Sequence, residues 1–493
     1  MNFIMKYIYK TLITLSLILG LSSCEGFLDK TPTDKVVASN ALLTIDDAAV
    51  AVNGLYTKLK YYSMYGSWMA TMGDMRADNL YPRELNGYSS IIYTLQYDSE
   101  SNSYFSLWQN YYTTILRANT LIANIETLKA DSADEIAVRD NYLGEAYAVR
   151  ALCYFDLARL YGKPYLYDKG ASLGAVLITQ LLSPSESEIP RSTVKETYAQ
   201  VLSDITEAGS LLSKERNPGH FNYWAAKLLK SRVELYMGDY SNAYADAVEV
   251  IKSSPYKMVE NAGYVDYWGR EGNNESVLEL LITTDGDIDP DGGFYTLYHN
   301  LWFEDLNAGA SVIPTKKWRE LFTNTPNDVR AQFIAYDDPE TGVKRTGEYW
   351  LKKFVGNKDL GYTFRRNNPK VMRITEAYLI AAEAGLECGA ADASDYLNAV
   401  RRRADATCVD VTATLNLVQT ERQKEFIGEG HRFFDVMRRG GTITRDLVSD
   451  PHDFAGTDNY KKSFSWDYYK VALPISKTEL ISYEVLQQTE GYK

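Results

Sequence analysis

The sequence predicts a mainly α-helical protein, built on a scaffold of tetratricopeptide-like helix pairs, with a loop-rich region that carries a few short strands. Apolar residues recur at helical spacing through most of residues 41–256 and 371–493. Residues 257–370 lose this period and are rich in Gly, Asp, Asn and aromatic residues. We expect these three regions to belong to one compact domain that spans residues 24–493.

The first 23 residues have the pattern of a secretory signal peptide. Lys6 and Lys10 precede an apolar run over residues 11–21. That run is about half as long as the roughly 20 residues that a transmembrane helix needs. We therefore expect residues 1–23 to be cleaved from the chain.

The cleavage site itself suggests a lipid anchor. Leu21-Ser22-Ser23-Cys24 resembles the lipobox of bacterial lipoproteins, in which the cysteine becomes the acylated first residue of the mature chain. Several acyl chains on Cys24 would anchor the protein stably to a membrane. Residues 24–40 are polar and aperiodic, as expected of a lipidated tether. An ordinary signal peptide cut near Ser23 is the alternative.

Long helices are expected early in the chain. Residues 45–60 (IDDAAVAVNGLYTKLK) begin with acidic residues and continue with a helical apolar period, as do residues 108–128. Residues 143–162 (LGEAYAVRALCYFDLARLYG) place Ala on one side and large apolar residues on the other, and they end at Gly162 before Pro164. This last segment is predicted to be a buried helix, since small residues allow close helix packing.

Two later segments have the spacing of tetratricopeptide-like helix pairs. Within residues 224–256, Gly238 is placed for the turn, Ala243 for the close helix contact, and Pro255 for the end of the second helix. A similar pair of helical patterns flanks Gly389. Between these pairs, the run SVLELLIT is a candidate strand.

Composition excludes several classes of function. The net charge of -13 and the pI near 5.0 argue against nucleic acid as a partner, because the phosphates would repel the protein. Only four His residues are present and none are closely spaced, so a transition-metal site is not expected. Cys153, Cys388 and Cys408 show no zinc spacing and are expected in the core; a Cys388–Cys408 disulfide stays open.

An enzyme is also not expected. Glu425, Glu429, His431 and Asp435 could in principle supply an acid, a base and an orienting group. We interpret them instead as charged groups that pair with one another and with Arg432 inside the fold. The sequence contains no GxSxG, HExxH or P-loop motif.

No cofactor is expected, with calcium as an open alternative. Asp287, Asp289 and Asp291 match the start of an EF-hand loop, but the closing position is Tyr298 rather than Glu. Pro290 also breaks the usual loop geometry. A looser calcium site at these aspartates remains a hypothesis.

The surplus of aromatic residues, 39 Tyr and 8 Trp, is the main clue to function. A pyranose stacks its C–H face on an aromatic ring, while its hydroxyl groups bind planar polar side chains. Aromatic residues beside Asn, Asp and Arg in loops therefore predict a glycan site, with Trp302 as the strongest candidate. The candidate ligand contacts are Trp302, Tyr298, Tyr295, Asn300, Trp268, Tyr81, Asp78, Asn79, Arg83 and Tyr88.

Five landmarks in order resemble the SusD-like (RagB/SusD) family of outer-membrane lipoproteins. They are the lipobox with FLDKTPTD, then GEAYAVRALCYFDLARLYGKPYL, YLNAVRRRAD, ERQKEFIGEGHRFFDVMRRG and the closing YYKVALPISKTEL. The resemblance implies a SusD-like α-α superhelix without catalytic residues. Only Glu25 follows the cysteine, where a surface-export signal is often more acidic.

The resemblance also implies a function. It predicts a glycan-binding lipoprotein at the cell surface that delivers oligosaccharides to a SusC-like TonB-dependent transporter in the outer membrane. Capture of peptides or another nutrient, a surface glycosidase with two carboxylates, and a protein-interaction scaffold are the alternatives. Which glycan is bound does not follow from the sequence.

Overall fold

The computed structural model describes residues 42–82, 87–100, 107–182, 188–282, 312–336, 349–354, 356–358, 367–445 and 462–492. Its longer helices are α2 (Ile45–Leu59), α4 (Gly87–Thr94), α5 (Leu107–Ile125), α6 (Ala133–Tyr161), α8 (Val194–Leu211), α9 (Tyr223–Met237), α10 (Tyr240–Ser253), α14 (Ile374–Cys388), α15 (Ala393–Ala404) and α16 (Leu415–Glu425). The shorter helices are α3 (Trp68–Asp74), α7 (Tyr165–Asp168), α11 (Tyr264–Tyr267), α13 (Lys316–Arg319), α17 (Arg432–Arg438) and α18 (Lys477–Ser482), and a π-helical turn, η2 (Tyr62–Gly66), precedes α3.

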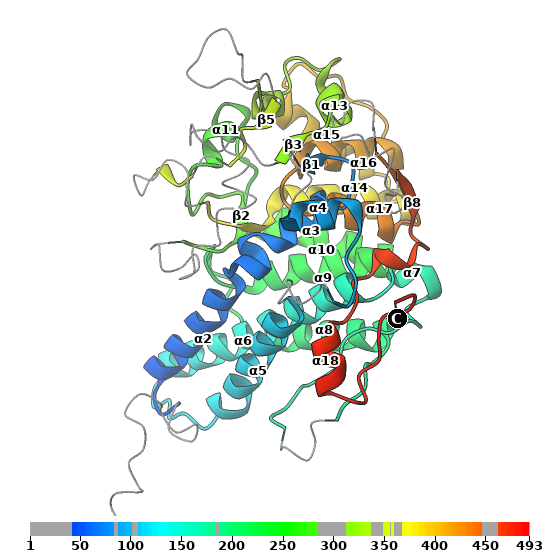
Figure 1. Ribbon diagram of the computed structural model, residues 1–493. Helices are drawn as coiled ribbons and strands as arrows, with labels where there is room; N and C mark the ends of the chain where they lie inside the picture. The colour runs from blue at the N-terminus through cyan, green and yellow to red at the C-terminus, as the bar shows by residue number, and fades with distance from the viewer. Residues whose placement is uncertain are drawn as a thin grey trace, which may run out of the picture.

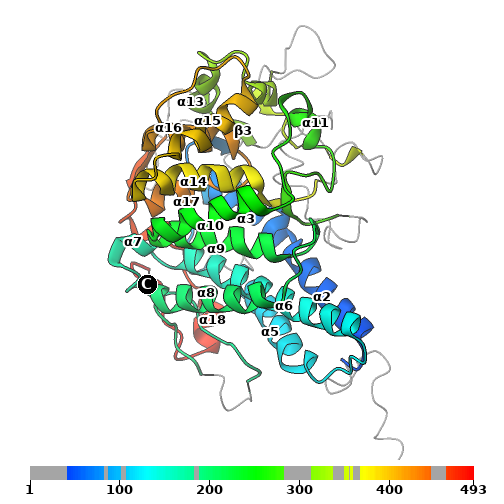
Figure 2. The same ribbon diagram turned by 180° about the vertical axis from the view of Figure 1, so that it is seen from behind.

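The helices are stacked in chain order along the molecule. Helix α6 packs against α5 and α8, α9 packs between α8 and α10, and α10 packs against α14. Figures 1 and 2 show this stack from opposite sides, running from α2 and α5 at one end to α15 and α16 at the other. The mainly α-helical fold predicted from the sequence is confirmed.

Helix ends follow the sequence signals. Ser132 caps α6, and Glu135 reaches back to the backbone N–H of Ser132, so both form a capping box. The helix ends at Gly162, as expected. Its C-terminal half is buried almost all round, because α6 is surrounded by α2, α5 and α8.

Both predicted helix pairs are present and pack against each other. Gly238, with φ of 77°, forms the turn between α9 and α10, and Gly389, with φ of 80°, ends α14 before α15. The Ser231 hydroxyl on α9 donates to the carbonyl oxygen of Ala243 on α10 at 2.7 Å. Ala243 is fully buried, which permits this close contact. Because α10 also packs on α14, the two pairs form one continuous scaffold.

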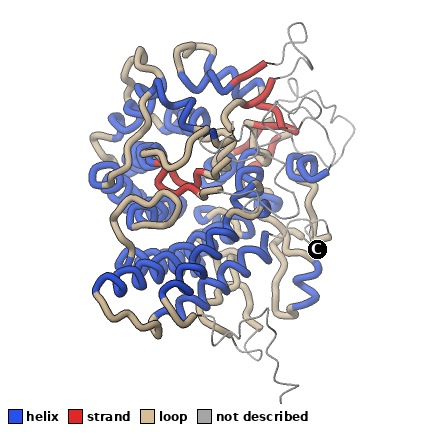
Figure 3. The backbone as a smooth tube through the Cα atoms, turned by 90° about the vertical axis from the view of Figure 1, so that its left-hand side faces the viewer, coloured by secondary structure: helices blue, strands red, loops and turns tan. Residues whose placement is uncertain are grey.

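The described strands form four two-stranded antiparallel ribbons. They are β1 (Leu80–Pro82) with β3 (Val312–Pro314), β2 (Ser276–Glu279) with β6 (Lys370–Arg373), β4 (Ile334–Tyr336) with β5 (Tyr349–Leu351), and β7 (Thr442–Thr444) with β8 (Ser463–Ser465). The candidate strand at residues 276–283 is thus confirmed for its first four residues. All these strands lie in the upper half of Figure 3, while the lower half consists of helices and loops.

Two sequence expectations concern cysteines and membranes. Cys153, Cys388 and Cys408 are free thiols, so the disulfide left open above is absent; Cys153 is buried, whereas Cys388 is exposed. Cys388 and the half-buried Cys408 therefore do not belong to the core, contrary to expectation. Within the described part of the chain, no helix has the length and apolar composition needed to cross a membrane.

Candidate functional site

The β1–β3 ribbon joins the two stretches that hold most of the predicted ligand contacts. Pro82 at the end of β1 is the partner of Val312 at the start of β3. The last described residue before position 83 and the first described residue after position 311 are therefore neighbours at one end of the ribbon. The predicted contacts Arg83, Tyr295, Tyr298, Asn300 and Trp302 lie outside the described residues and stay predictions.

The other residues predicted to bind a ligand, calcium or lipid are described only in part. Tyr88 stands on α4, but its side chain is not described. The calcium candidates Asp287, Asp289 and Asp291 also lie outside the described residues, as does Cys24. Among the residues that are described, no group of three or more His, Cys, Asp or Glu side chains is arranged to hold a metal ion.

Asp78, Asn79 and Tyr81 are not exposed loop residues. They are 4%, 1% and 7% exposed, respectively. The Asp78 carboxylate accepts hydrogen bonds from Arg432 Nε at 2.7 Å and from Lys317 Nζ at 2.7 Å. Burial alone would raise the pKa of Asp78, but the charges of Arg432 and Lys317 outweigh it and lower that pKa to about 2.

Asn79 has a structural role as well. Its Nδ2 donates to Asp74 at 3.3 Å, and its Oδ1 accepts from Gln423 Nε2 at 2.8 Å. The prediction of Asp78, Asn79 and Tyr81 as ligand contacts assumed that these side chains are exposed. That assumption is wrong, because pairing of β1 with β3 draws this segment into the interior. The polar groups of Asp78 and Asn79 hold distant parts of the chain together.

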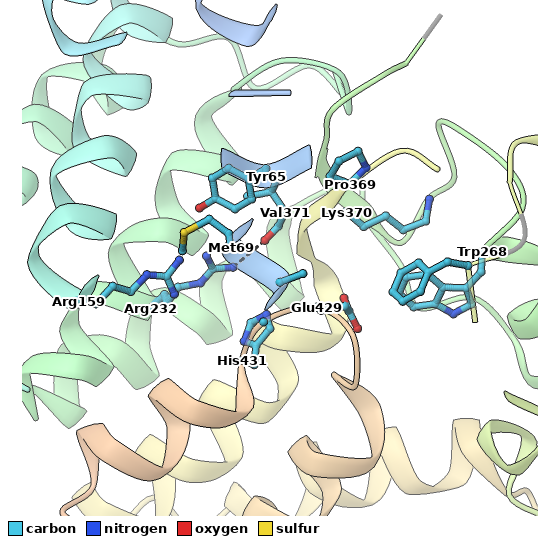
Figure 4. A pocket seen from close by; sticks show the side chains of 13 residues that line it. Tyr65, Met69, Arg159, Arg232, Trp268, Pro369, Lys370, Val371, Glu429 and His431 are labelled. Carbon is cyan, nitrogen blue, oxygen red and sulfur yellow. Dashed lines mark hydrogen bonds between the residues drawn. The ribbon is translucent and has the colours of Figure 1, made fainter. Parts of the chain in front are cut away.

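Trp268 is also buried, with 5% of its surface exposed. Its ring packs edge-on against Phe354, with centroids 5.5 Å apart, and Lys353 Nζ lies 4.2 Å from the ring centre. Trp268 lines a small cavity together with Glu429 and His431, as Figure 4 shows. The space inside has room for about two water molecules. It is too small for a sugar ring, so the expectation of an exposed Trp268 platform is wrong.

The group considered as an enzyme constellation is a buried ion network. Glu425 accepts hydrogen bonds from Arg373, Arg403 and Arg330 at 3.0, 2.8 and 3.1 Å. Burial alone would raise the pKa of Glu425, but these arginines hold that pKa well below its usual range. The carboxylate is thus ionised and fully paired, which suits a structural role.

Asp435 is ion-paired in the same way, whereas His431 is uncharged. Asp435 accepts hydrogen bonds from Arg422 Nε at 2.8 Å and from Arg438 Nε at 3.1 Å. Burial, together with nearby arginines, lowers the pKa of His431 well below its ordinary value, so its ring is neutral. The acidic side chains of this segment are thus paired, as expected, but several partners lie elsewhere in the chain. Glu429 pairs with Lys353 and Arg373, and Arg432 pairs with Asp78 rather than with this group.

An exposed aromatic pair that the sequence reasoning missed lies on the β4–β5 ribbon. Tyr336 and Tyr349 are directly opposite on the two strands, with ring centroids 4.9 Å apart. They are 50% and 36% exposed. The guanidinium of Arg319, at the end of α13, lies 3.5 Å from the centre of the Tyr349 ring. The sequence does contain a signal for this pair. Two short runs rich in apolar and aromatic residues, FIAY and YWL, flank the turn-rich segment DDPETGVKRTG, which is the pattern of a β-hairpin.

This aromatic pair lies beside the β1–β3 ribbon. Strand β5 packs against β3, and α13 follows β3 directly in the chain. Figure 1 shows β1, β3, β5 and α13 together at the top of the molecule. The residues Tyr336, Tyr349 and Arg319, called the tyrosine–arginine face below, are therefore the described candidate site for a ligand.

Comparison with known proteins identifies the family. A model described as the SusD family matches residues 288–492, and one described as starch-binding associating with outer membrane matches residues 26–235. A crystal structure of a SusD superfamily protein from Bacteroides thetaiotaomicron is 32% identical, with a TM-score of 0.83 over 91% of this chain and 100% of that one. This chain belongs to the SusD family.

Other SusD relatives cover nearly the whole chain too. SusD-like protein P25 of Formosa agariphila is 26% identical over 96% of this chain and 97% of its own length. A laminarin-binding SusD-like protein of known structure has a TM-score of 0.72 and 24% identity over 92% of this chain and 100% of its own. The similarity of this SusD-family chain to these relatives therefore extends over most of its length.

Proposed function

We propose that this chain is a glycan-binding lipoprotein of the outer membrane, which captures oligosaccharides and delivers them to a SusC-like TonB-dependent transporter. The observation that carries the proposal is the exposed Tyr336–Tyr349 pair beside an arginine, in a chain of the SusD family. Exposed aromatic rings with a planar polar neighbour suit the two faces of a sugar. The starch-binding description of the matching family and the laminarin-binding relative support the same class of ligand.

Capture at such a surface fits weak, reversible binding. Sugar hydroxyl groups exchange water for protein partners with little net gain per hydrogen bond. Two exposed rings therefore support dissociation constants between about 1 μM and 1 mM. Affinity this weak allows the protein to release its ligand to a transporter.

Calorimetry on the full chain, purified in a non-glycosidic detergent, tests ligand capture. We expect binding to at least one polysaccharide of a panel, and we expect Trp302→Ala or Tyr336→Ala to lower that affinity about tenfold. Tyr483→Ala is the matched control, because Tyr483 is 46% exposed and directly follows α18. Helix α18 lies far from β5 in Figure 1 and far from α13 in Figures 1 and 2. Peptide binding without glycan binding would overturn the proposal.

Delivery and catalysis need separate measurements. Purification of the tagged full chain from outer membranes should recover a β-barrel transporter in equal amounts. Incubation with a bound polysaccharide should release no new reducing ends, since a glycosidase would produce them. New reducing ends that disappear in Glu429→Gln would favour the glycosidase instead.

A further inference from the structure

Among the residues that the structure describes, the guanidinium of Arg319 has no polar partner. Every other arginine in the described ranges donates at least one side-chain hydrogen bond or forms an ion pair, whereas Arg319 contacts only the face of the Tyr349 ring. Its Nε is buried without a hydrogen-bond acceptor. A half-buried cation that lacks a counter-charge is costly, so this group is suited to gain an anion from outside.

The rings beside Arg319 are available to the same ligand. Tyr336 exposes half of its surface, and neither tyrosine hydroxyl has a hydrogen-bond partner within the described chain. The two rings are tilted by 50°, so they form a shallow angled surface rather than a closed stack. A sugar ring can lie on this surface with its substituents within reach of the guanidinium.

Local charge around the face also favours an anion. The protein as a whole carries a net charge of -13, yet α13 reads Lys316, Lys317, Trp318, Arg319. Lys317 is paired with buried Asp78, and Lys316 is 3.6 Å from Glu320, with both of these side chains more than half exposed. Lys316 and Lys317 are thus each matched by a carboxylate, which leaves Arg319 as the cation of α13 without a counter-charge among the described residues.

We propose that the tyrosine–arginine face is a subsite for an anionic sugar, a uronate or a sulfate ester, whose ring stacks on the tyrosines while its acid group binds Arg319. The planar guanidinium matches a carboxylate or sulfate with two parallel hydrogen bonds. A neutral sugar would leave the arginine without its counter-charge. This inference rests on the proposed glycan-binding function and names the class of glycan.

Calorimetry with matched charged and neutral sugars tests the inference on the full chain in detergent. The probes are alginate, carrageenan and chondroitin sulfate oligosaccharides, carboxyl-reduced alginate, desulfated carrageenan, and neutral laminari- and malto-oligosaccharides. We expect the protein to bind an anionic probe at least about tenfold more tightly than its neutralised counterpart, because charge-assisted hydrogen bonds are the stronger kind. The alginate and carrageenan arms separate carboxylate from sulfate recognition.

Variants assign that preference to Arg319. Arg319→Gln should lower affinity for the anionic probe about tenfold and leave the neutral counterpart unchanged, and Arg319→Lys should recover only part of the loss. Raising the salt concentration should weaken anionic binding in the native protein but not in Arg319→Gln. Arg139→Gln is the control, since Arg139 is a surface arginine on α6 paired with Asp140.

The outcomes separate this inference from the proposed function. Binding restricted to neutral glycans would overturn the inference and leave the function standing. Anionic binding that Arg319→Gln does not change would also overturn the inference. Absence of binding to every glycan would overturn both.

Discussion

Single carboxylates hold several arginines in the interior of this protein. Glu425 lies between Arg330, Arg373 and Arg403, and all four side chains are almost completely buried. Such clusters are stable only when every charge is paired, because an isolated buried charge is very costly. The Glu425 carboxylate is therefore engaged on all sides by the cluster.

Removing the central charge should be severe. We expect Glu425→Gln to lower the free energy of unfolding by about 3–5 kcal/mol, because three buried arginines would lose part of their compensation. Urea denaturation followed by circular dichroism measures this change. Glu320→Gln is the control, because Glu320 forms an exposed ion pair with Lys316. This change should alter the free energy of unfolding by less than about 0.5 kcal/mol. Equal effects of the two changes would contradict the role of Glu425.

Asp78 should make stability depend on pH in the acid range. Its pKa falls from 3.8 to about 2 on folding, so its ionised form stabilises the protein above pH 3.8 by about 2 kcal/mol. That contribution is lost as pH falls through 3.8 toward 2. The difference in unfolding free energy between the native protein and Asp78→Asn should therefore narrow by about 1 kcal/mol between pH 6 and pH 3. A constant difference would show that Asp78 does not titrate as described.

Close backbone contact joins α3 to the loop before α17. Gly73 on α3 faces Gly430, where a Cβ on Gly73 would lie 1.9 Å from the carbonyl oxygen of Gly430. The Gly430 N–H donates to the neighbouring Asp74 at 2.7 Å, and Gly430 itself has φ of 80°. Only glycine permits this approach, which brings the N-terminal and C-terminal helical regions together.

A pair of glycine substitutions tests that contact. Gly73→Ala should destabilise the protein by about 3 kcal/mol, since backbone atoms would have to move apart. Gly209→Ala on α8 is the control: nothing lies within 4 Å of the added methyl group, and loss of helical glycine should stabilise by about 0.5 kcal/mol. Thermal or urea unfolding measures both. Similar stabilisation by the two changes would rule out the tight contact.

Contacts across the whole chain support a single folding unit. Asp78 pairs with Arg432 across 354 positions, and Asn79 bonds Gln423 across 344. Near the C-terminus, Thr489 Oγ1 accepts a hydrogen bond from Arg191 Nη1 at 3.1 Å. The proposed lipid on Cys24 would thus anchor the assembled body through a tether that precedes it.

Anchoring should be separable from folding. We expect Cys24→Ala to release the protein from membranes, because the proposed acyl chains supply the attachment, while the melting temperature stays unchanged. Ultracentrifugation of lysed cells and a thermal melt measure the two properties. Cys388→Ala, which changes an exposed thiol, should remain in the membrane fraction. Retention of Cys24→Ala there would refute the lipid anchor.

The amino-acid sequence by itself determined the helices, both helix pairs and the family. These features depend on local signals that act over a few residues. Examples are the helical spacing of apolar residues in α6 and the turn at Gly238. The five ordered landmarks indicate the family, because they are motifs of the sequence itself.

Only the tertiary structure decided which side chains are exposed. Trp268 and Tyr81 stand in aromatic, polar segments that look like loops, yet both are buried. Trp268 packs against Phe333 and Phe354, and Tyr81 pairs with Ile313 on β3. Tyr336 and Tyr349 lie on strands and nevertheless face solvent. The exposure of a side chain depends on contacts with residues that can be hundreds of positions away, as with Asp78 and Arg432. A local sequence pattern does not indicate such a contact.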